Sequence, residues 1–228
     1  MIRAVFLNLF LLSLLFSQNT SDLKLGIKIG LNFSNISGAK RNYSGNLSDP
    51  HIKLGSNFGI ILNKAIDNTN SFQFEMLYND VGSEWGRPFF NLGYDGDYAI
   101  YELKYFSFFG YFKLKSKIGN LIKDFDFIIG AAYSYNFSAK QKWIVEVYDY
   151  DFETGPKDIR SEINHHEIGY IYGLKIPFKN RRLYLSLLFY NSISSLYSDS
   201  HTVYKDDFYN KEAMHNHTIS LCFDYFIF

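Results

Sequence analysis

Residues 23–34 read Leu-Lys-Leu-Gly-Ile-Lys-Ile-Gly-Leu-Asn-Phe-Ser. Every odd position holds a large apolar residue, whereas the even positions hold lysine, glycine, asparagine or serine. Successive side chains of a β-strand point to opposite faces, so this period of two predicts a strand. One face of that strand is apolar, and the other is polar and rich in small residues.

The same alternation returns along the rest of the chain. It is clear in residues 52–63, 71–79, 125–138 and 167–178, and it is shorter in 183–190 and 218–228. Residues 103–114 are apolar on both faces, but their length and aromatic content still fit a strand. The eight segments together predict an all-β chain.

The gaps between these segments alternate strictly between long and short. The long gaps are 35–51, 81–102, 139–166 and 191–217, and the short ones are 64–70, 115–124 and 179–182. An even-stranded up-and-down barrel sorts its connections in this way, and outer-membrane barrels have long extracellular loops and short periplasmic turns. The pattern predicts an eight-stranded antiparallel transmembrane β-barrel in the bacterial outer membrane, with both termini in the periplasm.

The composition agrees with this class of protein and excludes others. The 228 residues include 23 Lys+Arg and 23 Asp+Glu, so the net charge of zero gives no reason to bind nucleic acid. Aromatic residues make up 19% of the chain, which is far above what disordered chains contain. Cys222 is the single cysteine and excludes an intrachain disulfide.

The first residues have the features of a secretory signal. Arg3 supplies a positive start, residues 4–16 are mostly apolar, and Ser17 is a small residue at the expected cleavage position. Thirteen residues are fewer than the roughly 20 that span a bilayer, which disfavours the alternative of a membrane anchor. We expect a signal peptide over 1–17 and one barrel domain over 18–228.

The two strand faces predict which side meets lipid. Glycines gather on the polar face, and small side chains suit the crowded interior of an eight-stranded barrel. The other face carries almost no charge, as lipid contact requires. A soluble, secreted lipocalin-like barrel, with the apolar face turned inward around a ligand, remains the alternative.

Strand parity also predicts a set of charged residues inside the barrel. The set contains five lysines and four acids: Lys24, Lys28, Lys53, Glu75, Lys113, Asp126, Glu167, Lys175 and Asp224. Buried charges are costly unless they are paired, so we expect these groups to pair with one another and to fill the lumen. Eight strands enclose too little space for a wide pore.

An enzymatic alternative rests on histidines near the long-loop rim. His165, His166 and Glu167 precede one strand and His215 and His217 precede another. With Asp206 or Asp207 they offer ligands for a metal site or for a lipid-modifying enzyme at the outer leaflet. The spacing specifies no site and the common catalytic motifs are absent, so we predict no catalytic residue, metal ligand or cofactor.

The two longest gaps are aromatic and acidic, which favours a recognition surface. The candidate residues are Trp143, Tyr148, Tyr150, Phe152, Tyr204, Phe208 and Tyr209. Loops on a rigid barrel often carry function, and exposed aromatic residues are frequent at binding surfaces for proteins and glycans. The alternative is that the strands continue beyond the bilayer as a paired rim.

The chain also resembles a known family, the small outer-membrane β-barrel proteins of Bacteroidetes (porin-family or PorT-like, with an OmpA/OmpX-like barrel). The resemblance lies in Gly-x-x-x-Gly-x-Asn-x-Ser at residues 26–34 and in residues 72–78, where Glu75 stands at an inward glutamate position. Two features depart from the family: Ser107-Phe108-Phe109 replaces a Glu-x-Pro, and Phe228 is out of register with the apolar alternation of the last strand. The resemblance implies outer-membrane lipid and the barrel-assembly machinery as partners, and we expect a monomer.

Overall fold

The computed structural model describes residues 23–37, 51–67, 69–85, 97–118, 122–147, 150–153, 155–178, 182–196 and 214–227. The expected signal peptide, residues 1–17, lies outside these ranges. The strands are β1 (Leu23–Ser37), β2 (His51–Ala65), β3 (Asn70–Trp85), β4 (Asp97–Ile118), β5 (Ile122–Val147), β6 (Tyr150–Glu153), β7 (Lys157–Asp158), β8 (His166–Pro177), β9 (Leu183–Ser192) and β10 (His215–Phe226), and a 3₁₀ helix, η2, covers Arg160–Glu162. Within the described ranges, no helix is long and apolar enough to cross a bilayer.

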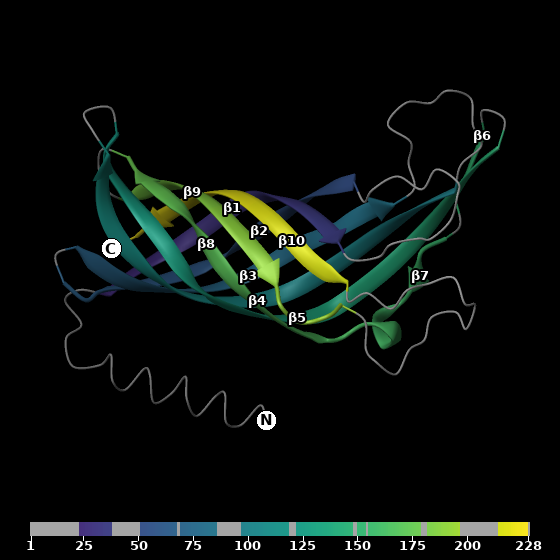
Figure 1. The fold of residues 1–228 in the computed structure, drawn as a ribbon, viewed down its shortest axis with the longest axis horizontal. Coiled ribbons are helices and arrows are strands. Elements are labelled where there is room, and N and C mark those ends of the chain that lie inside the picture. Colours follow the sequence, from purple (N-terminus) through teal and green to yellow (C-terminus); the bar gives the residue numbers. More distant parts are fainter. Residues whose placement is uncertain are drawn as a thin grey trace.

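Eight of the strands close into an antiparallel barrel (Figure 1). Each of β1 to β4 pairs with the next strand, β5 pairs with β8, and β9 and β10 follow in order. The barrel closes where β10 pairs with β1, from Gly26 opposite Phe226 to Ser37 opposite His215. The predicted eight-stranded up-and-down barrel is confirmed.

The apolar face of the strands points outward. On β1, Ile29 is 65% exposed, whereas the neighbouring Lys28 is 2% exposed and Asn32 is fully buried. The same alternation runs along β8 and β10, where each exposed residue is followed by a buried one. This orientation is the opposite of the lipocalin-like alternative, which would bury the apolar face around a ligand.

Strand β4 shows why residues 103–114 are apolar on both faces. Its outward residues include Phe106 and Phe112, which are exposed. Its inward residues include Tyr105, Phe109 and Tyr111, which are buried and fill the lumen. The inner face of this strand is apolar because large side chains are needed to pack the interior.

Inward glycines allow neighbouring strands to approach closely. A Cβ atom on Gly130 would lie 2.1 Å from the carbonyl oxygen of Gly110 and 2.4 Å from the Cβ of Tyr111. A Cβ atom on Gly59 would lie 2.0 Å from the carbonyl oxygen of Met76. Glycine is therefore required at these positions by the backbone of the adjacent strand.

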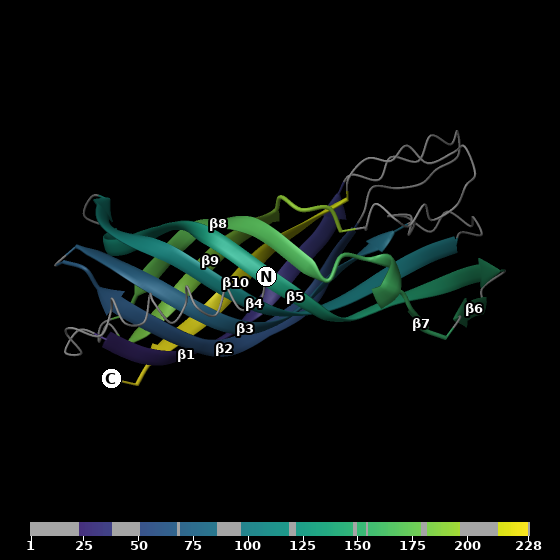
Figure 2. The ribbon, with the colours of Figure 1, turned by 90° about the horizontal axis from the view of Figure 1, so that it is seen from below.

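Long and short connections alternate as expected, but two strands are much longer than the sequence indicated. The predicted gaps 81–102 and 139–166 are too wide, because β3 continues to Trp85, β4 begins at Asp97 and β5 continues to Val147. Trp85 pairs with Ala99, and Asp97 pairs with Val145. These added strand ends, residues 81–85, 97–102 and 139–147, are called here the extension. Figures 1 and 2 show the extension, with β6 and β7 beside it, at the end opposite the C-terminus.

The predicted ends of β3, β4 and β5 were wrong because the extension lacks the apolar alternation that marks the rest of the barrel. Glu102 of β4 and Lys142 of β5, which are diagonal neighbours in the strand register, form a partly exposed ion pair at 3.4 Å. The backbone ladder continues while the apolar alternation stops. Residues 97–102 and 139–147, which were predicted to lie in loops, are therefore strand residues.

Asp67 organises the exposed turn between β2 and β3. Its carboxylate accepts hydrogen bonds from the hydroxyl and the backbone N–H of Thr69, and from the side chain and the backbone N–H of Asn70, all at 2.7–2.8 Å. These bonds favour the charged carboxylate and hold the pKa of Asp67 below its ordinary value of 3.8.

We expect Asp67→Ala to lower the unfolding midpoint, because the turn loses these four hydrogen bonds. A lowered pKa stabilises the fold above the ordinary value, so the advantage of the wild type is full above pH 3.8 and shrinks as the pH falls below it. Urea midpoints of both proteins in detergent, measured from neutral pH to about pH 2, check this. A difference that does not change with pH would contradict the assigned role of the carboxylate.

Candidate functional site

The structure places the nine predicted lumen residues in several groups. Lys28, Glu75, Lys175 and Asp224 form one cluster, and Lys113 and Asp126 form a separate pair. Lys53 pairs with Asp80, a residue outside the predicted set, and Glu167 lies apart from these groups. Lys24 is exposed at the start of β1 and does not join them.

The cluster of Lys28, Glu75, Lys175 and Asp224, called here the charge cluster, joins β1, β3, β8 and β10. Lys28 Nζ donates to Glu75 at 2.7 Å and lies 3.6 Å from Asp224. Lys175 Nζ lies 3.5 Å from Glu75 and also donates to Asp224. All four side chains are fully buried. Two positive and two negative charges therefore cancel inside the barrel.

Neutral side chains complete the charge cluster, and the sequence prediction missed them. Gln73 Nε2 donates to Glu75 at 2.7 Å, Ser186 Oγ donates to Asp224 at 2.9 Å, and the hydroxyl of Tyr111 also donates to Glu75. Buried carboxylates need several donors, and these three residues supply them. Their inward parity was a usable signal, because they alternate with outward residues on β3, β4 and β9.

Asparagine side chains form a second buried network on the wall made by β1, β2 and β3. Asn57 Nδ2 donates to Asn32 Oδ1 at 2.6 Å, and Asn32 Nδ2 donates to Asn79 Oδ1 at 3.2 Å. Ser220 Oγ of β10 donates to the same Asn32 oxygen at 2.7 Å. These bonds link four strands through the lumen without using a charge.

Two further ion pairs contain Lys113 and Lys53. Lys113 Nζ lies 3.6 Å from Asp126, and it also lies over the rings of Tyr184 and Phe226, at 5.1 and 5.7 Å from their centroids. Lys53 Nζ donates to Asp80 at 2.7 Å.

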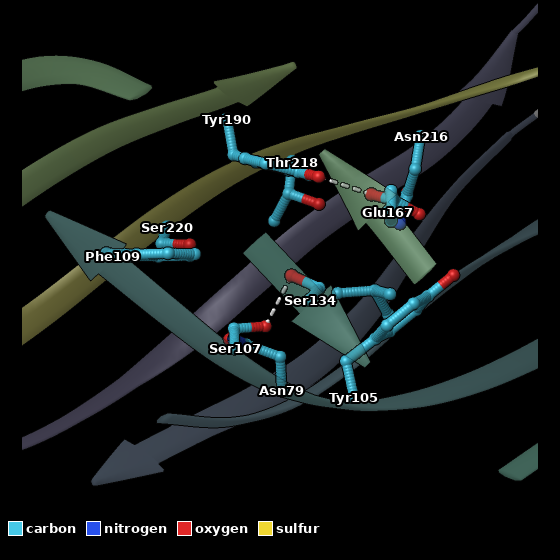
Figure 3. Close-up of a pocket in the computed structure, with 11 residues that line it drawn as sticks. Asn79, Tyr105, Ser107, Phe109, Ser134, Glu167, Tyr190, Asn216, Thr218 and Ser220 are labelled. Carbon is cyan, nitrogen blue, oxygen red and sulfur yellow. Dashed lines mark hydrogen bonds between the residues drawn. The ribbon is translucent and has the colours of Figure 1, made fainter. Parts of the chain in front are cut away.

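Glu167 lines a small cavity with both polar and apolar side chains in its wall, shown in Figure 3. The hydroxyl of Tyr190 donates to its carboxylate, and Ser107 and Ser134 form a hydrogen bond of 2.8 Å on the wall. About 20 Å³ of the cavity is open to the centre of a water molecule, which is enough to hold one. The lining residues are Asn79, Val81, Tyr105, Ser107, Phe109, Ser134, Glu167, Tyr190, Asn216, Thr218 and Ser220.

Apolar residues close the lumen on both sides of this cavity. Toward the extension, Ile36 and Leu103 pack with Ile159 and Ile163, which come from the segment between β7 and β8. Toward the short turns, a second apolar cluster is Leu77, Phe109, Tyr111, Ile128, Ala132, Ile171, Leu188 and Tyr190.

The histidines near the rim contact polar neighbours. His166 Nδ1 lies 2.7 Å from the hydroxyl of Tyr133, and the ring of His165 stacks on Tyr135. His217 lies within hydrogen-bond distance of Asn191 and Ser37, at 2.7 and 2.6 Å. Among the residues that the structure describes, no three His, Cys, Asp or Glu side chains gather in a metal-binding arrangement. Asp206 and Asp207 lie outside those residues.

The predicted recognition residues lie partly in the extension. Trp143 belongs to β5, and Tyr150 and Phe152 belong to β6, whose residues pair with the tip of β5. The other four, Tyr148, Tyr204, Phe208 and Tyr209, lie outside the described residues. Two of the seven therefore sit in a short strand beside the extension of the barrel wall.

Solved structures that are similar to the chain include Neisserial surface protein A (TM-score 0.42, 9% identity, 88% of this chain and 96% of that chain covered). Another is Ail, the attachment invasion locus protein of Yersinia pestis (TM-score 0.40, 14% identity, 90% and 99% covered). No curated protein sequence matches the chain.

A family model described as "Outer membrane protein beta-barrel domain" matches residues 16–198, most of the chain. Its match covers β1 to β9. The chain, with its closed eight-stranded barrel and outward apolar face, belongs to this family of outer-membrane β-barrel proteins.

Proposed function

We propose that the chain is a non-enzymatic, surface-interaction protein of the bacterial outer membrane, which uses its sheet extension and long loops to bind an extracellular protein or glycan. The observation that carries this proposal is the continuation of β4 and β5 beyond the closed barrel. The two strands stay paired as far as Asp97 and Val145, and β6 adds a further strand to the edge. A paired sheet of this length presents a rigid surface away from the lipid.

The packing of the described residues inside the barrel supports the same proposal, because it favours a lumen that is not a wide pore. The charge cluster and the apolar layers occupy the interior, and the described cavity holds about one water molecule. A barrel of this kind serves as a platform for its outer end and not as a channel.

The chemistry of the outer end suits recognition. Aromatic residues Trp143, Tyr150 and Phe152 lie on the extension or next to it, and acidic residues lie between them in the sequence. Aromatic residues contribute much of the binding energy at many interfaces, and acids supply hydrogen-bond acceptors for glycan hydroxyls. Tyr204, Phe208 and Tyr209 lie outside the described residues, between β9 and β10 in the sequence, and we include them in the proposed recognition role.

The orientation and the partners complete the proposal. The short turns and both termini face the periplasm, residues 1–17 act as the signal peptide, and the outward apolar side chains contact lipid. The chain is a monomer inserted by the barrel-assembly machinery. The motif at residues 26–34 supports an origin among the Bacteroidetes-type, PorT-like members of the family.

Deletion of residues 144–153 tests the role of the extension. Ile144 pairs with Glu153 and Val147 with Tyr150, so this deletion removes the hairpin tip in register and leaves the barrel intact. We expect the variant to fold and to show the wild-type heat-dependent gel shift. Bacteria that display it should lose most of their binding to glycan arrays and to immobilised extracellular-matrix proteins.

The matched control is Gly155→Ala, which lies just after the hairpin and where a Cβ atom would meet no neighbour within 4 Å. It should bind as the wild type does. Unchanged binding by the deletion variant, or no binding by the wild type to either kind of target, would refute the recognition role. A steady conductance of the wild type in planar bilayers would refute the filled lumen.

A further inference from the structure

Glu167 differs from the other buried acids by having no basic partner. The carboxylates of Glu75, Asp224 and Asp126 each face at least one lysine. Glu167 is 3% exposed, yet no Lys, Arg or His side chain of the described residues forms an ion pair with it. An uncompensated buried carboxylate is costly, so a positive charge is expected to neutralise it.

Oxygen atoms without partners surround the same cavity. Within the part of the chain that the structure describes, Asn216 Oδ1 and Thr218 Oγ1 are buried and make no hydrogen bond, and the hydroxyl of Tyr105 lies close to the carboxylate of Glu167. All three residues line the cavity together with Glu167, and Figure 3 shows them around it. Buried polar atoms nearly always have a partner, so these atoms indicate a bound species in the cavity.

The geometry points to a monovalent metal cation of the Na⁺ type, and we propose that Glu167, Asn216, Thr218 and Tyr105 bind one. Hard cations prefer carboxylate, amide and hydroxyl oxygens, which is the donor set present here. A single positive charge would neutralise Glu167, just as the lysines neutralise the other acids. A divalent cation would leave one excess charge in the interior.

The position of the cavity suits the retention of an ion. Val81 and Tyr105 belong to the apolar cluster on the side of the extension, and Phe109 and Tyr190 belong to the cluster on the other side. All four residues also line the cavity. A cation held between two apolar layers exchanges slowly with solvent and stabilises the closed barrel by mass action.

The test measures unfolding midpoints of the refolded full chain in detergent, with NaCl replaced by choline chloride at constant ionic strength. We expect the midpoint of the wild type to rise with Na⁺ and to saturate. At free Na⁺ of about 100 times the Kd, the folding equilibrium constant rises about 100-fold over its value in choline. Glu167→Gln has nearly the same shape without the charge, and it should lose this response.

Two further variants keep the test decisive. Glu102→Gln makes the same change at a partly exposed ion pair on the extension, and it should keep the full Na⁺ response. Thr218→Val removes one oxygen ligand with little change in shape. It should shift the response to higher Na⁺ concentration even where Glu167→Gln fails to fold.

Several outcomes would overturn the proposal. Equal wild-type midpoints in NaCl and choline would exclude a stabilising cation. The wild-type midpoint could instead be independent of Na⁺ and rise on acidification, while the midpoint of Glu167→Gln does not rise. That result would show that Glu167 binds a proton in place of the cation. The titratable groups that face it are Tyr105 of β4 and Tyr190 of β9. A saturable response to Ca²⁺ alone would replace the monovalent ion with a divalent one.

Discussion

Glu75→Gln is expected to lower the free energy of unfolding by about 3–5 kcal/mol, the range for breaking a buried ion pair. Glu75 accepts hydrogen bonds from Lys28, Gln73 and Tyr111 and lies 3.5 Å from Lys175. Removal of its charge leaves two fully buried lysines with Asp224 as their only acid in the charge cluster. Urea unfolding of the protein refolded in detergent measures the loss.

A matched control and a rescue variant define the cause. Glu102→Gln, at a partly exposed ion pair on the extension, should cost less than about 1 kcal/mol. The double variant Lys28→Met with Glu75→Gln leaves Lys175 paired with Asp224, so it should recover more than half of the loss. Equal costs for the two glutamine variants, or no recovery in the double variant, would contradict the charge-balance explanation.

Gly130→Ala is expected to prevent refolding or to cost at least about 2 kcal/mol, because the new Cβ atom would overlap the backbone of β4. The carbonyl oxygen of Gly110 lies 2.1 Å from the position of that atom, and backbone cannot rotate away. The heat-dependent gel shift and the urea midpoint measure the effect.

Gly110→Ala is the matched control on the neighbouring strand. Gly110 pairs with Ala131 and faces outward, and an added Cβ atom would meet only the ring of Phe72, at 3.4 Å. This substitution should be neutral or slightly stabilising, because alanine restricts the unfolded chain. A comparable loss at both positions would show that glycine matters here for reasons other than strand approach.

Alternation predicted seven of the eight barrel strands and the outward apolar face, residues 103–114 were assigned on length and aromatic content, and the order of long and short gaps predicted the closed topology. These properties follow from local rules, since the side-chain period of a strand is two and lipid excludes charge. Residues 23–34 already show both rules. The ends of β4 and β5 were missed because the apolar alternation stops there, although the backbone ladder between the two strands continues.

The site was harder to predict, because parity gives the face of a residue but not its depth in the barrel. Lys24 and Lys28 share a face, yet Lys24 is exposed at the end of β1 and Lys28 is buried at the centre. Lys28 meets Glu75, which is 47 residues away, only because of the register between β1, β2 and β3. Register depends on the whole sheet, so a single sequence does not reveal which charges meet.

The charge cluster also joins the first strand of the barrel to the last. Lys28 stands directly opposite Asp224 in the pairing of the first strand with the last, which is the pairing that closes the barrel. Before closure, Lys28 can already pair with Glu75 of β3, and Asp224 can pair with Lys175 of β8. The contacts between these two pairs form only when the first strand meets the last, so the charge cluster favours the closed barrel over an open sheet.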